Sequence, residues 1–199
     1  MGLIVRPHDL LLLAGGGSWE AALSDWARTS LAGCPWAVVR RALCPPGLIP
    51  VGVRGPNRSQ RHAALVPTAA VIRRVLPEAL RSHPRLPHLA ATLSAVARLL
   101  DGVAVWGPTG GVGFELATGR SATHAASDLD VLVRAPYRWD QAVATRLAEA
   151  FAALPARVDC LLETPRGGVN LVEWSRAGGS VVARTAHGPQ LVTDPWDAA

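Results

Sequence analysis

The sequence predicts an α+β (mixed α/β) protein in two parts. Short strand-like apolar runs and helical segments follow one another along all 199 residues. A proline-rich stretch at 82–87, SHPRLP, separates two such series. Hydrophobic residues make up 49% of the chain, which is normal for a globular protein and argues against disorder. We therefore expect a small N-terminal α+β domain over residues 1–84. Residues 85–199 should form a second domain with helices packed on a mixed sheet.

In the N-terminal part, residues 3–14 contain an apolar run that we expect in the core. His8 and Asp9 stand at its start. They could contact a ligand, but capping of a helix through backbone N–H groups is the favoured interpretation. The remaining predicted elements are a helix over 18–31 capped by Ser18, strands at 36–40 and 48–53, and a helix over 68–81 that is interrupted at Pro77.

Three arginines, Arg54, Arg58 and Arg61, lie close together in the glycine- and proline-containing stretch 51–67. The arginine guanidinium group suits bidentate contacts with phosphate. A solvated basic loop is the alternative, because charge runs usually face water. We weigh the two interpretations about equally, since the glycines beside Arg54 also suit the close approach of a ligand.

The C-terminal part begins with a clear helical pattern that Asp101 and Gly102 end. Its predicted elements are helices over 89–100 and 137–154 and strands over 103–106, 156–163, 169–174, 180–185 and 190–193. Between the first of these strands and the second helix lies WGPTGGVGFELATGRSATHAASDLDVLV, residues 106–133, on which the functional prediction rests.

This stretch contains a glycine pair and two aspartates one residue apart. Gly110 and Gly111 open the element after a strand, where backbone N–H groups can approach a phosphate closely. Asp128 and Asp130 lie in a strand-like run, so both side chains should point to one face, with Cα atoms about 7 Å apart. Two such carboxylates repel each other unless a cation lies between them. Mg²⁺ held together with substrate phosphates fits this pair best.

The order strand, Gly-Gly, short helix, loop and Asp-x-Asp resembles the active-site layout of the DNA polymerase β-like nucleotidyltransferases. GGVGFELATG followed by SDLDVLV is similar to the malonate decarboxylase holo-acyl-carrier-protein synthases, a family of phosphoribosyl-dephospho-CoA transferases. The arginine-rich stretch and the final DPW also resemble that family. Its glycine motif usually carries Gly-Ser, and Gly111 stands here in place of the serine, so a hydroxyl contact to phosphate is lost or replaced by backbone N–H.

The resemblance implies a third carboxylate on a neighbouring strand, and Asp159 matches that place. A charged residue among apolar neighbours such as Val158 and Leu161 needs a partner. We favour this interpretation over an edge-strand aspartate that faces water, with Glu163 and Glu173 as substitutes.

The resemblance further implies the reaction. The 5-phosphoribosyl-dephospho-CoA group would pass from 2′-(5″-triphosphoribosyl)-3′-dephospho-CoA to a serine of the apo acyl carrier protein of malonate decarboxylase, and diphosphate would leave. Asp128, Asp130 and Asp159 would bind Mg²⁺ (or Mn²⁺), while Gly110 and Gly111 would hold phosphates. The alternatives are another nucleotidyltransferase of this fold that moves AMP or CMP, and an inactive fold member that binds nucleic acid.

Composition excludes several other classes of protein. The chain has no lysine, which rules out a Walker-type NTPase and Schiff-base chemistry. Its net charge of +5 favours a polyanionic ligand or an acidic partner, but 5% aromatics and no basic run give little support for nucleic acid. The histidines fit no zinc spacing, and Cys34, Cys44 and Cys160 suggest reduced structural thiols. Without a membrane span or signal-peptide pattern, we expect a cytoplasmic protein with no membrane contact.

Overall fold

The computed structural model describes residues 3–55, 57 and 60–197, and its α+β architecture agrees with the prediction. The chain forms two compact units, Met1–Leu76 and Pro77–Ala199. The division thus falls earlier than residue 84. The short 3₁₀ helix η3 (Pro77–Ala79) belongs to the second unit, because Glu78 pairs there with Arg134 at 2.5 Å. Gly107 permits the close approach of η3, since a Cβ on it would lie 2.1 Å from the Pro77 carbonyl oxygen.

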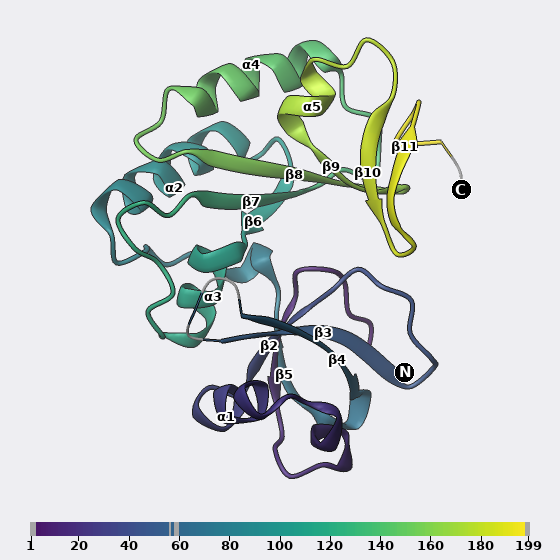
Figure 1. The fold of residues 1–199 in the computed structure, drawn as a ribbon. Helices are drawn as coiled ribbons and strands as arrows, with labels where there is room; N and C mark the ends of the chain where they lie inside the picture. Colours follow the sequence, from purple (N-terminus) through teal and green to yellow (C-terminus); the bar gives the residue numbers. More distant parts are fainter. Residues whose placement is uncertain (1–2, 56, 58–59, 198–199) are drawn as a thin grey trace. The chain divides into compact units, whose positions relative to one another are not determined.

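The first unit is an antiparallel sheet of five strands in the order β4-β3-β2-β1-β5, with a helix packed on β3 (Figure 1). Its strands are β1 (Leu10–Leu13), β2 (Trp36–Val39), β3 (Leu48–Arg54), β4 (Arg61–Pro67) and β5 (Val71–Val75). Its helical elements are η1 (Ser18–Ala22), α1 (Asp25–Gly33) and η2 (Thr68–Ala70). The core lies between α1 and the sheet and contains Leu11, Leu31, Ile49 and Val51.

Two predictions for the first unit are wrong in detail. The helix expected over 18–31 is split, because Ser24 has an extended backbone and α1 starts only after it. The helix expected over 68–81 is mainly strand β5, which pairs with β1 from Leu10↔Val75 to Leu13↔Val71. That pairing joins segments far apart in the sequence and supplies the hydrogen bonds that a local helix would otherwise make.

Asp9 does not cap a helix, since the strand β1 follows it. Its carboxylate is fully buried, accepts a hydrogen bond from the Arg6 backbone N–H and pairs with Arg74 of β5, both at 2.8 Å. The segment that begins with His8 and Asp9 is therefore a turn that fixes the entry to the first sheet. Removing Arg74 would take a cationic partner from a buried carboxylate, which is destabilising.

The second unit is a sheet of six strands in the order β11-β10-β9-β8-β7-β6, in which β7 and β8 run parallel and the other pairs are antiparallel. Its strands are β6 (Val105–Pro108), β7 (Leu129–Arg134), β8 (Val158–Thr164), β9 (Gly167–Asn170), β10 (Val181–Thr185) and β11 (Gly188–Val192). Its helices are α2 (Pro87–Leu100), α3 (Gly110–Thr118), α4 (Gln141–Ala152) and α5 (Leu171–Ser175). The predicted strand over 169–174 is wrong beyond Asn170, because Asn170 caps α5.

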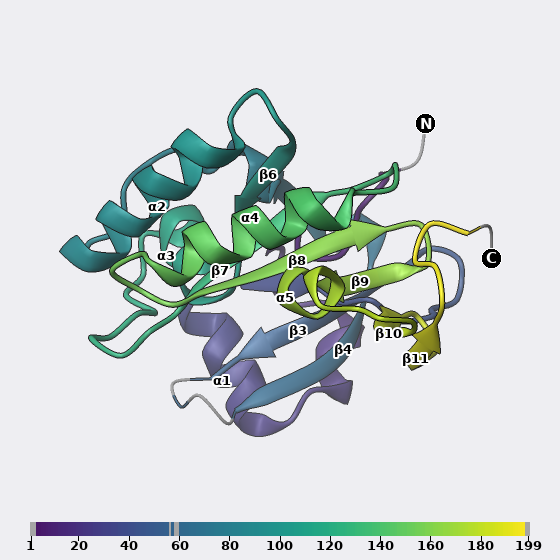
Figure 2. The same cartoon turned by 90° about the horizontal axis from the view of Figure 1, so that it is seen from above.

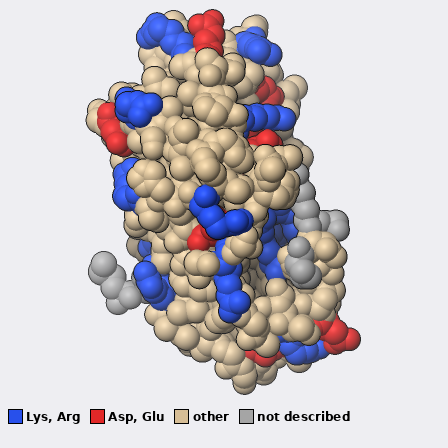
Figure 3. Space-filling model, turned by 90° about the vertical axis from the view of Figure 1, so that its left-hand side faces the viewer, with Lys and Arg blue, Asp and Glu red and all other residues tan. Residues whose placement is uncertain are grey.

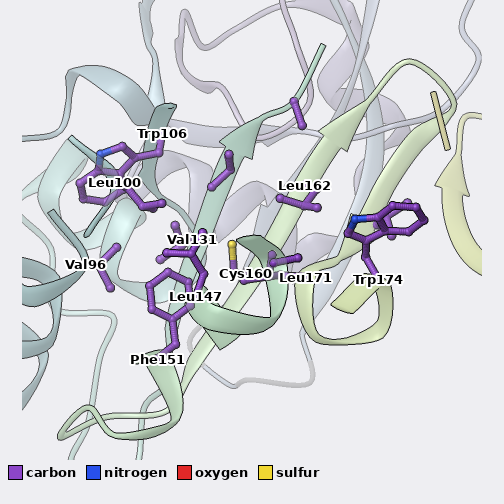
Figure 4. Close-up of a cluster of buried hydrophobic side chains, with 14 of the residues drawn as sticks. Val96, Leu100, Trp106, Val131, Leu147, Phe151, Cys160, Leu162, Leu171 and Trp174 are labelled. Atoms are coloured by element: carbon purple, nitrogen blue, oxygen red, sulfur yellow. The ribbon is translucent and has the colours of Figure 1, made fainter. Parts of the chain in front are cut away.

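Helices α2 and α4 cover one face of this sheet (Figures 1 and 2). Alternate residues of β7 and β8 face them and form the core drawn in Figure 4. Because strand side chains alternate between faces, the intervening residues Asp130 and Asp159 belong to the other face. The core includes Val96 and Leu100 of α2, Leu147 and Phe151 of α4, and Val131, Cys160 and Leu162 of the strands.

The C-terminal tail is part of the second unit. Trp196 packs edge-on against Trp174, with ring centroids 5.0 Å apart, and its indole N–H donates to the Ala135 carbonyl at 2.8 Å. Asp194 pairs with Arg138. Among the described residues, no helix is long and apolar enough to cross a membrane.

Candidate active site

The start of α3 brings a glycine directly against one of the predicted aspartates. Gly110 has a left-handed backbone with φ 58°, and a Cβ on it would lie 1.7 Å from Asp130 Oδ2 and 2.5 Å from Asp130 Cγ. The neighbouring Thr109 N–H donates to the Asp130 carbonyl at 2.8 Å, which ties the helix start to β7. Glycine is needed here both for its backbone conformation and for the space that the carboxylate occupies.

The predicted juxtaposition of carboxylates on neighbouring strands is present. Asp130 of β7 and Asp159 of β8 are register partners in the parallel pair. Both residues are half-buried, as is Asp128, which stands one position before β7 begins. No hydrogen bond or ion pair within the described part of the chain engages the Asp128 side chain. The predicted strand that contains Asp128 and Asp130 is present, but β7 begins one residue later, at Leu129.

Asp159 is held by a residue that sequence reasoning missed. Asn170 Nδ2 donates to Asp159 Oδ1 at 2.8 Å. Asp159 and Asn170 also line a pocket of about 530 Å³, most of whose lining belongs to α4 and the core on the helix side of the sheet. It is lined by Ala148, Phe151, Ala152, Leu154, Arg157, Val158, Asp159, Cys160, Asn170, Leu171 and Val172.

A buried carboxylate, Glu115 of α3, organises the loop that leads to Asp128. It accepts hydrogen bonds from the backbone N–H groups of Ala122 (3.1 Å) and Arg85 (3.3 Å) and from Thr123 Oγ1 (2.8 Å). Burial alone would raise the pKa of Glu115, but these hydrogen bonds outweigh it and the pKa lies below its ordinary value. Glu115 is thus ionised at neutral pH and ties the 119–128 loop to α3. In the sequence, this role is indicated by a single glutamate within an apolar helical stretch.

Cys160 is a core residue and not a nucleophile. Burial raises the pKa of its thiol, and the negative charge of Asp159 raises it further. All three cysteines are free, as predicted. The substitutes considered for Asp159 have other neighbours. Glu163 is the register partner of Arg134, and Glu173 Oε1 accepts a hydrogen bond from the Val182 N–H at 2.8 Å.

The predicted arginines belong to the first unit, whereas the aspartates and glycines belong to the second. Arg54 and Arg61 are register partners across the β3–β4 hairpin. Arg58 lies outside the described residues. Gly111 begins the first turn of α3 beside Gly110, and a Cβ on it would lie 3.2 Å from the Ala122 carbonyl oxygen. This tight spacing shows that the loop before Asp128 packs closely on Gly111.

A cation at these carboxylates would need ligands from the substrate as well. Within the described residues, no three His, Cys, Asp or Glu side chains form a group that could hold a metal ion by themselves. Mg²⁺ is usually bound through one or two carboxylates together with substrate phosphates and water. The Asp128–Asp130 segment beside the start of α3 provides such a donor set, with Asp159 on the next strand. That the three aspartates share the ion stays a prediction.

A Gly-Gly helix start against Asp130, with Asp159 on the adjacent parallel strand, resembles the layout of a nucleotidyltransferase. Comparison with known proteins shows a family of transferases. Residues 6–77 match the model of the phosphoribosyl-dephospho-CoA transferase MdcG N-terminal domain, and residues 75–195 match that of the C-terminal domain. The chain belongs to the phosphoribosyl-dephospho-CoA transferase family.

Curated relatives named phosphoribosyl-dephospho-CoA transferase match over nearly their whole length. The chain is 43% identical to one from Pseudomonas putida (strain GB-1) over 195 residues, 97% of this chain and 96% of the relative. It is 43% identical to one from Azotobacter vinelandii over 202 residues, 98% and 95%. It is 39% identical to one from Klebsiella pneumoniae (strain 342) over 197 residues, 96% of each. No solved structure matches the chain.

Proposed function

We propose that this transferase moves the 5-phosphoribosyl-dephospho-CoA group of 2′-(5″-triphosphoribosyl)-3′-dephospho-CoA onto a serine of an apo acyl carrier protein, that of malonate decarboxylase. The names of the relatives supply the transferred group. The observation that carries the proposal is the contact of the Asp130 carboxylate with Gly110 at the start of α3. The N-terminus of a nine-residue helix attracts phosphate, and the neighbouring carboxylates can hold a cation on the same phosphates.

In the proposed reaction the serine oxygen bonds to the α-phosphorus, the bond from that phosphorus to the departing diphosphate breaks, and the serine proton passes to solvent. Gly110 and Gly111 hold the departing phosphates through backbone N–H groups. Asp128 and Asp130, with Asp159 of β8, would hold Mg²⁺ or Mn²⁺. When bound, the cation would neutralise phosphate charge and acidify the serine hydroxyl. The remaining contribution of the protein is positioning, which dominates in phosphoryl transfer.

The charge of the chain supports an acidic acceptor more than a nucleic acid. The net charge is +5, and acyl carrier proteins are typically acidic, so charge complementarity would speed their association. On the face shown in Figure 3, several arginine side chains have acidic side chains beside them. Nucleic-acid-binding proteins more often gather their basic residues in a stripe.

Mass spectrometry of the acceptor tests the proposal. The apo carrier protein, the triphosphoribosyl substrate and Mg²⁺ are incubated with the protein, and diphosphate release is measured in parallel. We expect the carrier to gain the mass of one phosphoribosyl-dephospho-CoA group for each diphosphate released. A gain of an AMP or CMP group from ATP or CTP in place of this product would assign the other nucleotidyltransferase activity. Full diphosphate release from metal-stripped protein in excess chelator would refute the role of the cation.

A further inference from the structure

The Asn170 side chain has two structural partners at once. Its Oδ1 accepts hydrogen bonds from the backbone N–H groups of Val172 (2.9 Å) and Glu173 (3.2 Å), which makes Asn170 the N-cap of α5. Its Nδ2 donates to Asp159 Oδ1 at 2.8 Å. The two backbone donors settle which end of the amide is oxygen, so the NH₂ group must point to Asp159.

This arrangement fixes the carboxylate through the backbone of the fold. Asn170 is the last residue of β9, and α5 follows it without a loop (Figure 1). Its backbone is held in the sheet by the pairing of β9 with β8, and its side chain is held by α5. A donor fixed at both ends restricts the rotation of Asp159 and occupies one carboxylate oxygen, which leaves the second oxygen for another ligand.

We propose that Asn170 is a positioning residue that orients Asp159 for binding the catalytic cation. The inference rests on the proposed function, in which Asp159 completes the carboxylate set. Hydrogen-bonding partners of metal-binding carboxylates fix the orientation of those ligands, and their loss typically reduces metal affinity or activity about 10–100-fold. The geometry predicts that the NH₂ group of Asn170 orients Asp159 for the site, whereas the Asn170 side-chain oxygen stabilises the start of α5.

The two roles can be separated by Asn170→Ser. Serine caps a helix about as well as asparagine but is too short to donate to Asp159 while it does so. We expect the melting temperature to stay close to that of the wild type. Mn²⁺ affinity in the presence of the triphosphoribosyl substrate, measured by electron paramagnetic resonance, should fall about tenfold or more. The Mn²⁺ concentration for half-maximal transfer should rise by a similar factor.

Asp140 offers a matched control. It caps α4 in the same way, accepting hydrogen bonds from Ala142 N–H (2.6 Å) and Val143 N–H (3.3 Å), but it is exposed and none of its hydrogen bonds reaches an aspartate of the site. Asp140→Ala should lower the melting temperature and leave Mn²⁺ affinity unchanged. Wild-type Mn²⁺ affinity and turnover in Asn170→Ser would overturn the proposal. So would an affinity loss that Asp140→Ala reproduces, because Mn²⁺ affinity would then respond to a change that removes no hydrogen bond to Asp159.

Asp159→Asn distinguishes failure of this inference from failure of the proposed function. If Asp159→Asn weakens Mn²⁺ binding and Asn170→Ser does not, Asp159 is a ligand that needs no orientation by Asn170, and only the positioning role is refuted. If Asp159→Asn binds Mn²⁺ and turns over like the wild type, Asp159 lies outside the cation site and both statements fall.

Discussion

Gly110→Ala is the substitution with the sharpest expected outcome. The added Cβ would lie 1.7 Å from Asp130 Oδ2, whereas real Cβ contacts almost never fall below 3.0 Å. The carboxylate must therefore retreat by about 1 Å or more, and a misplacement of that size can cost about 100-fold in rate. In addition, alanine at φ 58° carries the left-handed backbone penalty of about 1–2 kcal/mol.

Gly119 separates the two effects, because it ends the same helix with a similar backbone. Its φ is 69°, and a Cβ built on it meets nothing within 4 Å. Gly119→Ala should therefore lose about 1–2 kcal/mol of unfolding free energy, as Gly110→Ala does from strain alone, but should keep its activity.

Urea unfolding and steady-state diphosphate release measure these two quantities on the same preparations. We expect Gly110→Ala to be destabilised at least as much as Gly119→Ala, because the clash with Asp130 adds to the backbone strain, and only Gly110→Ala to lose about 100-fold or more in kcat/KM. Equal activity of the two variants would refute the reasoning, since the Asp130 carboxylate would then have no role at the start of α3.

Three further predictions concern the carboxylates and the arginines. Asp128→Asn should abolish transfer without lowering the melting temperature, because it removes one of two neighbouring negative charges; a melting temperature as low as that of a core deletion would make the residue structural. The folded-state pKa of Glu115 lies below the ordinary 4.5, so its contribution to stability is present above that pH and is lost as the pH falls through the folded value. Acid titration of unfolding should accordingly show a smaller stability difference between wild type and Glu115→Gln at low pH than at pH 7. Replacing Arg54 and Arg61 by Gln should lower kcat/KM for the CoA-derived substrate at saturating carrier protein. Wild-type kinetics toward both substrates would show that the two arginines are solvated surface residues without a role in binding.

The parts of the fold that follow local rules could be predicted from the sequence. The alternation of apolar residues in β7 and β8 places Asp130 and Asp159 on the sheet face away from α2 and α4, and the parallel pairing sets them side by side. Strand β5 could not be predicted in this way. Its partner β1 lies far back in the chain, so its pairing is invisible to a local window.

The residues that support the site were harder to find because they act through tertiary contacts. Glu115 looks like an ordinary helical residue until the 119–128 loop folds onto it. Thr123 and Arg85, which complete its hydrogen bonds, lie on opposite sides of it in the sequence. The spacing of residues in the sequence does not show which distant groups will contact Glu115. A carboxylate in an apolar helix indicates only that it needs some hydrogen-bonding or charged partner.

Asn170 did leave a signal in the sequence, which the apolar run after it obscured. Asn170-Leu171-Val172-Glu173 has a capping residue followed three positions later by Glu, a pattern typical of helix starts. Val169 to Trp174 equally suits a buried strand, and short apolar runs do not distinguish the two. In the structure the segment after Asn170 is the helix α5, which the Asn170 side-chain oxygen caps, while the Glu173 side chain accepts a hydrogen bond from the Val182 N–H. Because the Asn170 oxygen serves as the cap, its NH₂ group can donate to Asp159. A correctly predicted helix start leaves the Asn170 NH₂ group available for a partner, but only the pairing of β9 with β8 brings Asp159 to it.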